Sequence, residues 1–67
     1  MIQVRLNGKD REIESDLTLR ELLESLELNP HMVVVELNRE IISRDVIGDV
    51  RVEEGDQVEL VHFVGGG

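Results

Sequence analysis

The residues of this sequence best suited to chemistry are three glycines that follow an apolar run at its end, VHFVGGG, residues 61–67. Glycine has no β-carbon, so another protein's backbone can approach Gly65, Gly66 and Gly67 closely. Three residues extend about 10 Å at most and would form a thin, flexible arm that fits a narrow channel. The carboxylate of Gly67 is unhindered, and ATP-dependent adenylation would make it an acyl donor. A frayed end or a cloning remnant without function is the competing interpretation.

Side chains suited to catalysis are few elsewhere in the sequence, which has no cysteine and no tyrosine. Ser15, Ser25 and Ser43 have no histidine beside them and lie in no nucleophile-elbow context. His31 follows a proline as a loop residue, and His62 belongs to an apolar strand-like run. A chain of 67 residues also has little room to enclose a substrate pocket. We therefore expect that this chain does not catalyse a reaction alone.

Acidic residues outnumber basic ones by fifteen to seven, giving a formal net charge of -8. This charge repels phosphate backbones, so we expect no nucleic-acid partner. It would steer the chain toward a basic protein surface, unless its role is solubility alone. The acidic groups near the end lack the ligand spacing of a calcium loop and predict a solvated turn with no bound metal; they are Glu53, Glu54, Asp56 and Glu59.

Length and composition predict one small cytoplasmic domain, residues 1–64, followed by the glycine arm, residues 65–67. The absence of cysteine excludes a disulfide framework and is typical of a reducing compartment. The first residues, MIQVRLNG, alternate apolar and polar side chains and do not build a secretory signal. No apolar run approaches membrane-spanning length, so we expect no membrane partner.

The elements that must position the glycines begin with a β-hairpin. Ile2, Val4 and Leu6 alternate with polar residues, the period of a half-buried strand. Asn7-Gly8 is the dipeptide best suited to a two-residue hairpin turn. Residues 9–14 would then return as the second strand.

A helix is predicted from Thr18 to Glu27. Thr18 and Glu21 have the spacing of a capping box, although Asp16 could cap the helix slightly earlier instead. Four leucines then recur at helical intervals. Leu28-Asn29-Pro30 would end the helix, because the residue before a proline disfavours helical geometry. The leucine stripe would pack onto the hairpin.

The remaining residues predict three strands. Residues 32–37 are rich in β-branched side chains, Asn38-Arg39 forms a turn, and residues 40–42 form a short edge strand. Residues 45–48 would make a single helical turn, and residues 57–64 the last strand. This order predicts an α+β fold with a mixed sheet of four to five strands and one helix across one face.

The last strand is apolar on both faces, which is typical of a central strand. Val58, Leu60 and Val64 point one way, while Val61 and Phe63 point the other. If the helix covers the Val58 face, then Val61 and Phe63 form an exposed docking surface for a partner. The alternative is that Phe63, the only aromatic residue, belongs to the core.

These segments together resemble the ThiS/MoaD family of sulfur carrier proteins, which belongs to the ubiquitin-like β-grasp superfamily. The resemblance covers the hairpin, the helix TLRELLESL, the segment VVVELNREII and the ending VEEGDQVELVHFVGGG. This ending is the most specific part, since a terminal Gly-Gly alone occurs in many chains. Gly66 and Gly67 match the family's Gly-Gly motif, and Gly65 adds length to the arm.

The resemblance implies a carrier cycle in the synthesis of the thiazole of thiamine. A ThiF-type adenylyltransferase would use Mg-ATP to adenylate Gly67, and a sulfur relay fed by a cysteine desulfurase would convert the adenylate to a thiocarboxylate. A ThiG-type thiazole synthase would accept the sulfur, and the chain itself would bind no cofactor. Two alternatives stay open: the small subunit of molybdopterin synthase, and a β-grasp interaction module with an inert tail.

Overall fold

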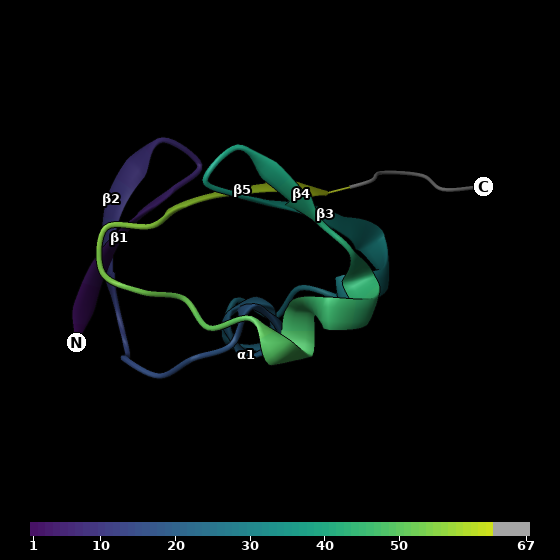
Figure 1. Cartoon of the computed structure of the whole chain (residues 1–67), viewed down its shortest axis with the longest axis horizontal. Helices are drawn as coiled ribbons and strands as arrows, with labels where there is room; N and C mark the ends of the chain where they lie inside the picture. The colour runs from purple at the N-terminus through teal and green to yellow at the C-terminus, as the bar shows by residue number, and fades with distance from the viewer. Residues whose placement is uncertain (63–67) are drawn as a thin grey trace.

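The chain folds into a mixed sheet with a helix packed under one face (Figure 1). The computed structural model describes residues 1–62. The five strands of this part have the order β2-β1-β5-β3-β4, in which β1 and β5 are parallel and the other neighbours antiparallel. The elements are β1 (Ile2–Leu6), β2 (Lys9–Ile13), α1 (Leu19–Ser25), η1 (Pro30–Met32), β3 (Val33–Leu37), β4 (Glu40–Ile42), η2 (Arg44–Asp49) and β5 (Gln57–His62).

The predicted α+β class and central last strand are therefore confirmed, and most boundaries agree within two residues. The short helical segment η2 is longer than the single turn expected at residues 45–48. The last strand is described to His62, and Phe63 and Val64 lie outside the described residues. No helix in the described part is long and apolar enough to cross a membrane.

Both hairpins use two-residue turns in the left-handed region. Asn7 and Gly8 have φ of 51° and 81°, and Asn38 and Arg39 have φ of 52° and 72°. Two consecutive positive φ angles are the geometry whose twist matches that of the flanking strands. The second turn reaches this geometry without a glycine, which the sequence predicted only as a turn of unspecified type.

Helix α1 begins as predicted but ends earlier. The Thr18 hydroxyl accepts a hydrogen bond from the Glu21 backbone N–H at 3.1 Å, and the Glu21 carboxylate accepts from the Thr18 N–H at 2.9 Å. The helix ends at Ser25, two residues before the predicted end. Glu27 has φ of 59°, and the Leu28 N–H donates to the Leu23 carbonyl at 2.9 Å. This left-handed C-terminal turn ends the helix before Pro30 is reached.

We expect Glu27→Gly to stabilise the fold by about 1 kcal/mol, because glycine adopts the left-handed conformation without the steric cost of a β-carbon. Urea unfolding followed by circular dichroism would measure the change. The matched control is Glu24→Gly, which places glycine inside α1 and should destabilise by about 1 kcal/mol. Equal losses for both variants would contradict the described helix end.

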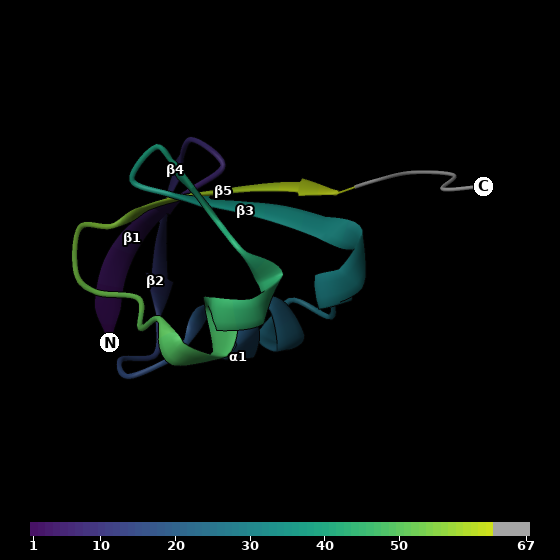
Figure 2. The same cartoon turned by 45° about the vertical axis from the view of Figure 1, so that its right-hand side comes forward.

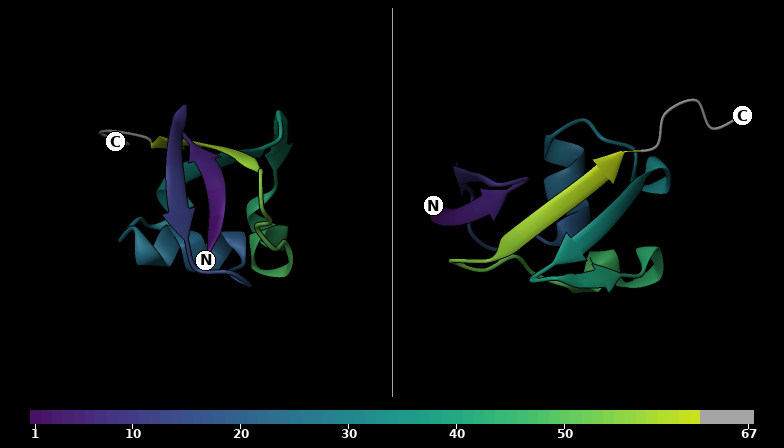
Figure 3. Two further views of the ribbon diagram at one scale, coloured as in Figure 1. Left: turned by 90° about the vertical axis from the view of Figure 1, so that its left-hand side faces the viewer. Right: turned by 90° about the horizontal axis from the view of Figure 1, so that it is seen from above.

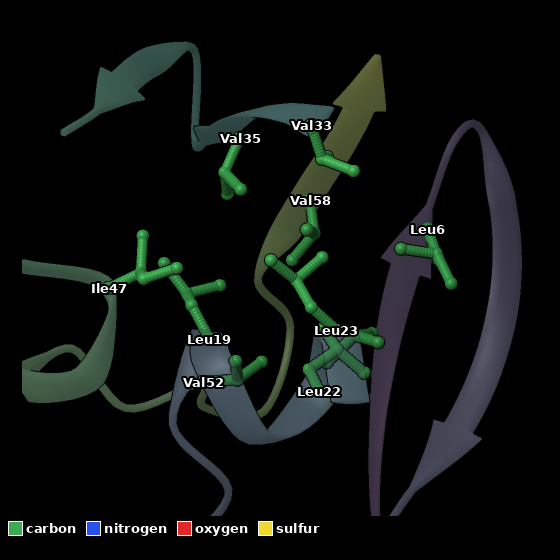
Figure 4. Close-up of a cluster of buried hydrophobic side chains, with 10 residues drawn as sticks. Leu6, Leu19, Leu22, Leu23, Val33, Val35, Ile47, Val52 and Val58 are labelled. Carbon is green, nitrogen blue, oxygen red and sulfur yellow. The ribbon is translucent and has the colours of Figure 1, made fainter. Parts of the chain in front are cut away.

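The core lies between the sheet and the helical layer formed by α1 and η2 (Figures 2 and 4). In Figure 4, Leu19, Leu22 and Leu23 of α1 point toward Val58 of β5 and the other sheet residues. The Val50 and Val52 backbones bond to the chain at the start of α1, and Val52 is buried. The buried core residues are Val4, Leu6, Leu19, Leu22, Leu23, Val33, Val35, Ile47, Val52 and Val58.

Candidate functional site

The predicted site follows β5 toward the glycines, and the structure settles the orientation of this strand. Val58 is fully buried against the helical layer, whereas Val61 is 52% exposed on the opposite face. The predicted exposure of Val61 is therefore confirmed. Phe63 and the three glycines Gly65, Gly66 and Gly67 lie outside the described residues, so the docking role of Phe63 and the glycine arm stay predictions.

The face of the sheet that carries Val61 is opposite α1 and η2 (Figure 2). Val61 lies opposite Val34 of β3, while Glu59 and Ile41 both lie opposite Glu36. Ile41 is 72% exposed, and Val34 is half-buried. We call this set of five residues the open face. It is an apolar group with two acidic neighbours.

The open face carries an unfavourable charge arrangement. Glu36 and Glu59 lie directly opposite each other on neighbouring strands, where like charges destabilise a sheet. In residues 1–62, the one ion pair joins Arg51 and Asp16 at 3.4 Å, away from these two strands and largely in solvent. The carboxylates of the open face are thus available to a basic partner, which agrees with the charge of the chain as a whole.

Polar side chains fix the position of β5 in the sheet. The Asn7 side-chain oxygen accepts a hydrogen bond from the Leu60 N–H at 2.7 Å. The Asn38 side chain accepts from the Gln57 N–H at 2.9 Å and donates to Asp56 at 3.1 Å. The sequence patterns predict both asparagines only as turn residues and do not predict these contacts. No local signal reveals them, since the partners are 18 to 53 residues apart.

The described part offers surfaces rather than a cluster of reactive side chains. Among residues 1–62, no group of three or more histidine, aspartate or glutamate side chains is arranged to hold a metal ion. His31 lies beside the Arg44 guanidinium, with 3.5 Å between Nδ1 and the nearer nitrogen, and His62 is exposed at the end of β5. The open face and the end of β5 are therefore the candidate functional site.

Comparison with known protein families decides the assignment. The model that describes the ThiS family matches residues 4–67 of this chain. The chain belongs to the ThiS family. The match extends through the residues that carry the Gly-Gly motif, Gly66 and Gly67.

Individual relatives agree with membership of the ThiS family. The sulfur carrier protein ThiS of Bacillus subtilis is 43% identical over 65 residues, which are 96% of this chain and 98% of that protein. The crystal structure of the thiamine biosynthesis protein ThiS from Geobacter metallireducens superposes with a TM-score of 0.83 at 35% identity, covering 98% of this chain and all of that one. The fold is thus the ubiquitin-like β-grasp of the ThiS family.

A longer relative has a different name. The thiazole synthase of Magnetococcus marinus is 42% identical to this chain over 66 residues, which are 98% of this chain but 20% of that protein. The chain thus spans about a fifth of the length of that relative. A segment similar to a ThiS-family chain is therefore part of a larger polypeptide named thiazole synthase.

Proposed function

We propose that this chain is a sulfur carrier in the synthesis of the thiazole of thiamine. The observation that carries the proposal is membership of the ThiS family, with similarity to the Bacillus subtilis carrier along nearly all of both chains. This similarity favours the thiamine pathway over the small subunit of molybdopterin synthase and over an interaction module with an inert tail.

In the proposed cycle, the carboxylate of Gly67 is the group that changes. A ThiF-type adenylyltransferase, which binds the Mg-ATP, transfers AMP to this carboxylate with release of pyrophosphate. A persulfide of a sulfur relay fed by a cysteine desulfurase then displaces AMP and forms an acyl disulfide. A thiol of the relay cleaves the S–S bond, becoming a disulfide itself, and leaves a thiocarboxylate at Gly67. The chain is a co-substrate in each step, and the cycle requires Gly67 to be the last residue of the working chain.

The described residues contribute recognition to this cycle. The open face presents Val34, Ile41 and Val61 beside two carboxylates, which suits an apolar partner surface with basic residues at its rim. Because β5 leads directly into residues 63–67, a partner that binds this face holds the reacting end near its own active site. Phe63 follows β5 directly in the sequence, and we propose that it adds to this contact.

Thiazole synthase is the proposed sulfur acceptor. The longer relatives support this pairing, since a segment similar to this chain occurs within a polypeptide of that name in Magnetococcus marinus and, at 37% identity, in Paramagnetospirillum magneticum. Two functions joined in one polypeptide commonly act on the same reaction. A separate chain of the ThiS family would then meet a separate thiazole synthase.

Intact-mass measurement tests the carrier function. The chain is incubated with a ThiF-type adenylyltransferase, Mg-ATP and a sulfur source, and we expect a mass gain equal to the replacement of one oxygen by sulfur. Fragmentation should place the gain at Gly67, and omission of ATP should prevent it. An unchanged mass, with an adenylyltransferase that modifies another ThiS-family carrier in parallel, would exclude the carrier function.

A further inference from the structure

Strand β5 has neighbours on both sides for only part of its length. On one side β3 pairs with it from Val58 to His62. On the other side β1 pairs only with Gln57 and Val58, and then turns away at Asn7. Figure 3, right, shows β5 continuing past the end of the β1–β2 hairpin, with α1 visible beneath. Residues 60–62 thus form an inner edge of the sheet, which we call the open edge.

The backbone groups of the open edge point away from β3. The Val58 carbonyl accepts a hydrogen bond from the Asn7 N–H at 2.9 Å, and the Leu60 N–H donates to the Asn7 side chain. The backbone groups of Val58 and Leu60 therefore point toward β1. Alternate residues of a strand direct their N–H and C=O groups to the same side. The Leu60 carbonyl and the His62 N–H and carbonyl therefore also point to the β1 side of β5. Strand β1 ends at Leu6, and no other strand of residues 1–62 pairs with β5 on this side.

The open edge lacks the charged residues that protect β2, at the border of this sheet, from pairing with another chain. Strand β2, at one border, has four charged residues among its five, and β4, at the other, is three residues long. Short length and charge are the usual devices that keep a strand edge from pairing with another chain. The open edge is as short as β4, but its three residues include no acidic, lysine or arginine side chain. Leu60 and Val61 are apolar, and Leu60 is only partly buried against the core.

We propose, on the basis of the proposed function, that an extended segment of thiazole synthase adds to the open edge as a further strand. The edge offers three backbone groups in sequence: the Leu60 carbonyl accepts, the His62 N–H donates and the His62 carbonyl accepts. β-Strand addition uses such main-chain hydrogen bonds. A second copy of the chain is a poor occupant, because each copy has a formal net charge of -8. Gly67 is the fifth residue after His62, so a strand bound here is held within about 17 Å of the reacting carboxylate.

His62→Pro tests this strand addition directly. Proline removes the His62 N–H, which faces the open edge and takes no part in the ladder with β3, so the fold should be retained. His62→Ala is the matched control, since it removes the imidazole and keeps the N–H. In calorimetric titrations against thiazole synthase from the same organism, we expect His62→Pro to weaken binding at least tenfold and His62→Ala less than threefold.

Equal binding of both variants, with wild-type binding intact, would overturn the strand addition and leave the carrier function standing. Failure of the wild-type chain to bind thiazole synthase would count against the proposed acceptor itself.

Amide hydrogen exchange gives a second measurement on the wild-type chain, which does not depend on the folding of the proline variant. The His62 amide should exchange quickly in the free chain and slow at least tenfold in the complex. If exchange of the His62 amide slows when the chain alone is concentrated, without thiazole synthase, then a second copy of the chain binds the open edge. That result would overturn the proposal.

Discussion

Removal of two glycines from the end of the chain should abolish its ATP-dependent modification. The variant that ends at Gly65 loses the Gly-Gly pair, and two residues fewer shorten the greatest reach of the end by about 7 Å. A displacement of 1 Å can cost about a hundredfold in the rate of an enzymatic reaction. We therefore expect the rate of sulfur incorporation, followed by intact mass, to fall at least a hundredfold. The unfolding midpoint should not change.

A variant that lacks one glycine is the matched control. It still ends in a Gly-Gly pair, but its arm is about 3.5 Å shorter at full extension. It therefore separates the effect of arm length from the effect of losing the Gly-Gly pair. Because the variant without one glycine keeps a Gly-Gly pair at its end, we expect it to be modified more slowly than the wild-type chain but faster than the variant that ends at Gly65. Undiminished modification of the variant that ends at Gly65 would show that the glycines have no role in the reaction.

Leu23→Ala should remove a large part of the stability of the domain. Leu23 is fully buried between α1 and the sheet, as Figure 4 shows. Truncation of a buried leucine typically costs about 2–5 kcal/mol, through lost burial and the cavity left behind. A 67-residue domain has a total stability of roughly 3–10 kcal/mol, so the variant should be partly unfolded at 25 °C or close to it. Urea unfolding measures the loss.

The control for this prediction is Glu24→Ala, at the next position of the same helix. Glu24 is exposed, and its replacement should change the free energy of unfolding by less than about 0.5 kcal/mol. A loss below about 1 kcal/mol for Leu23→Ala would mean that α1 does not pack on the sheet as described.

Local patterns in the sequence predict most elements of this fold. The alternation of Ile2, Val4 and Leu6 and the Asn7-Gly8 turn identify the first hairpin, and Thr18 identifies the start of the helix. These signals act over a few residues, where side-chain period and backbone preference decide the structure. The same reasoning orients β5 correctly, as the burial of Val58 and the exposure of Val61 show.

What the sequence does not predict depends on contacts between distant residues or on unusual backbone conformations. Glu27 adopts a left-handed conformation that glycine usually provides, so the helix ends earlier than its leucine pattern suggests. The parallel pairing of β1 with β5 joins the two ends of the chain and has no local signature. The open edge exists only because β1 pairs with β5 in the register that ends at Leu6 and Val58. It can therefore be identified from the structure but not from the sequence.

The position of β5 also affects how the chain is synthesised. Among the five strands of residues 1–62, β5 is synthesised last, and it is the middle strand of the sheet, between β1 and β3. A nascent chain that stops before Gln57 has two separate hairpins and lacks Val58, so it cannot close its core. Prematurely terminated products would then remain unfolded and open to proteolysis. Folding of the sheet would thus show that translation has passed β5.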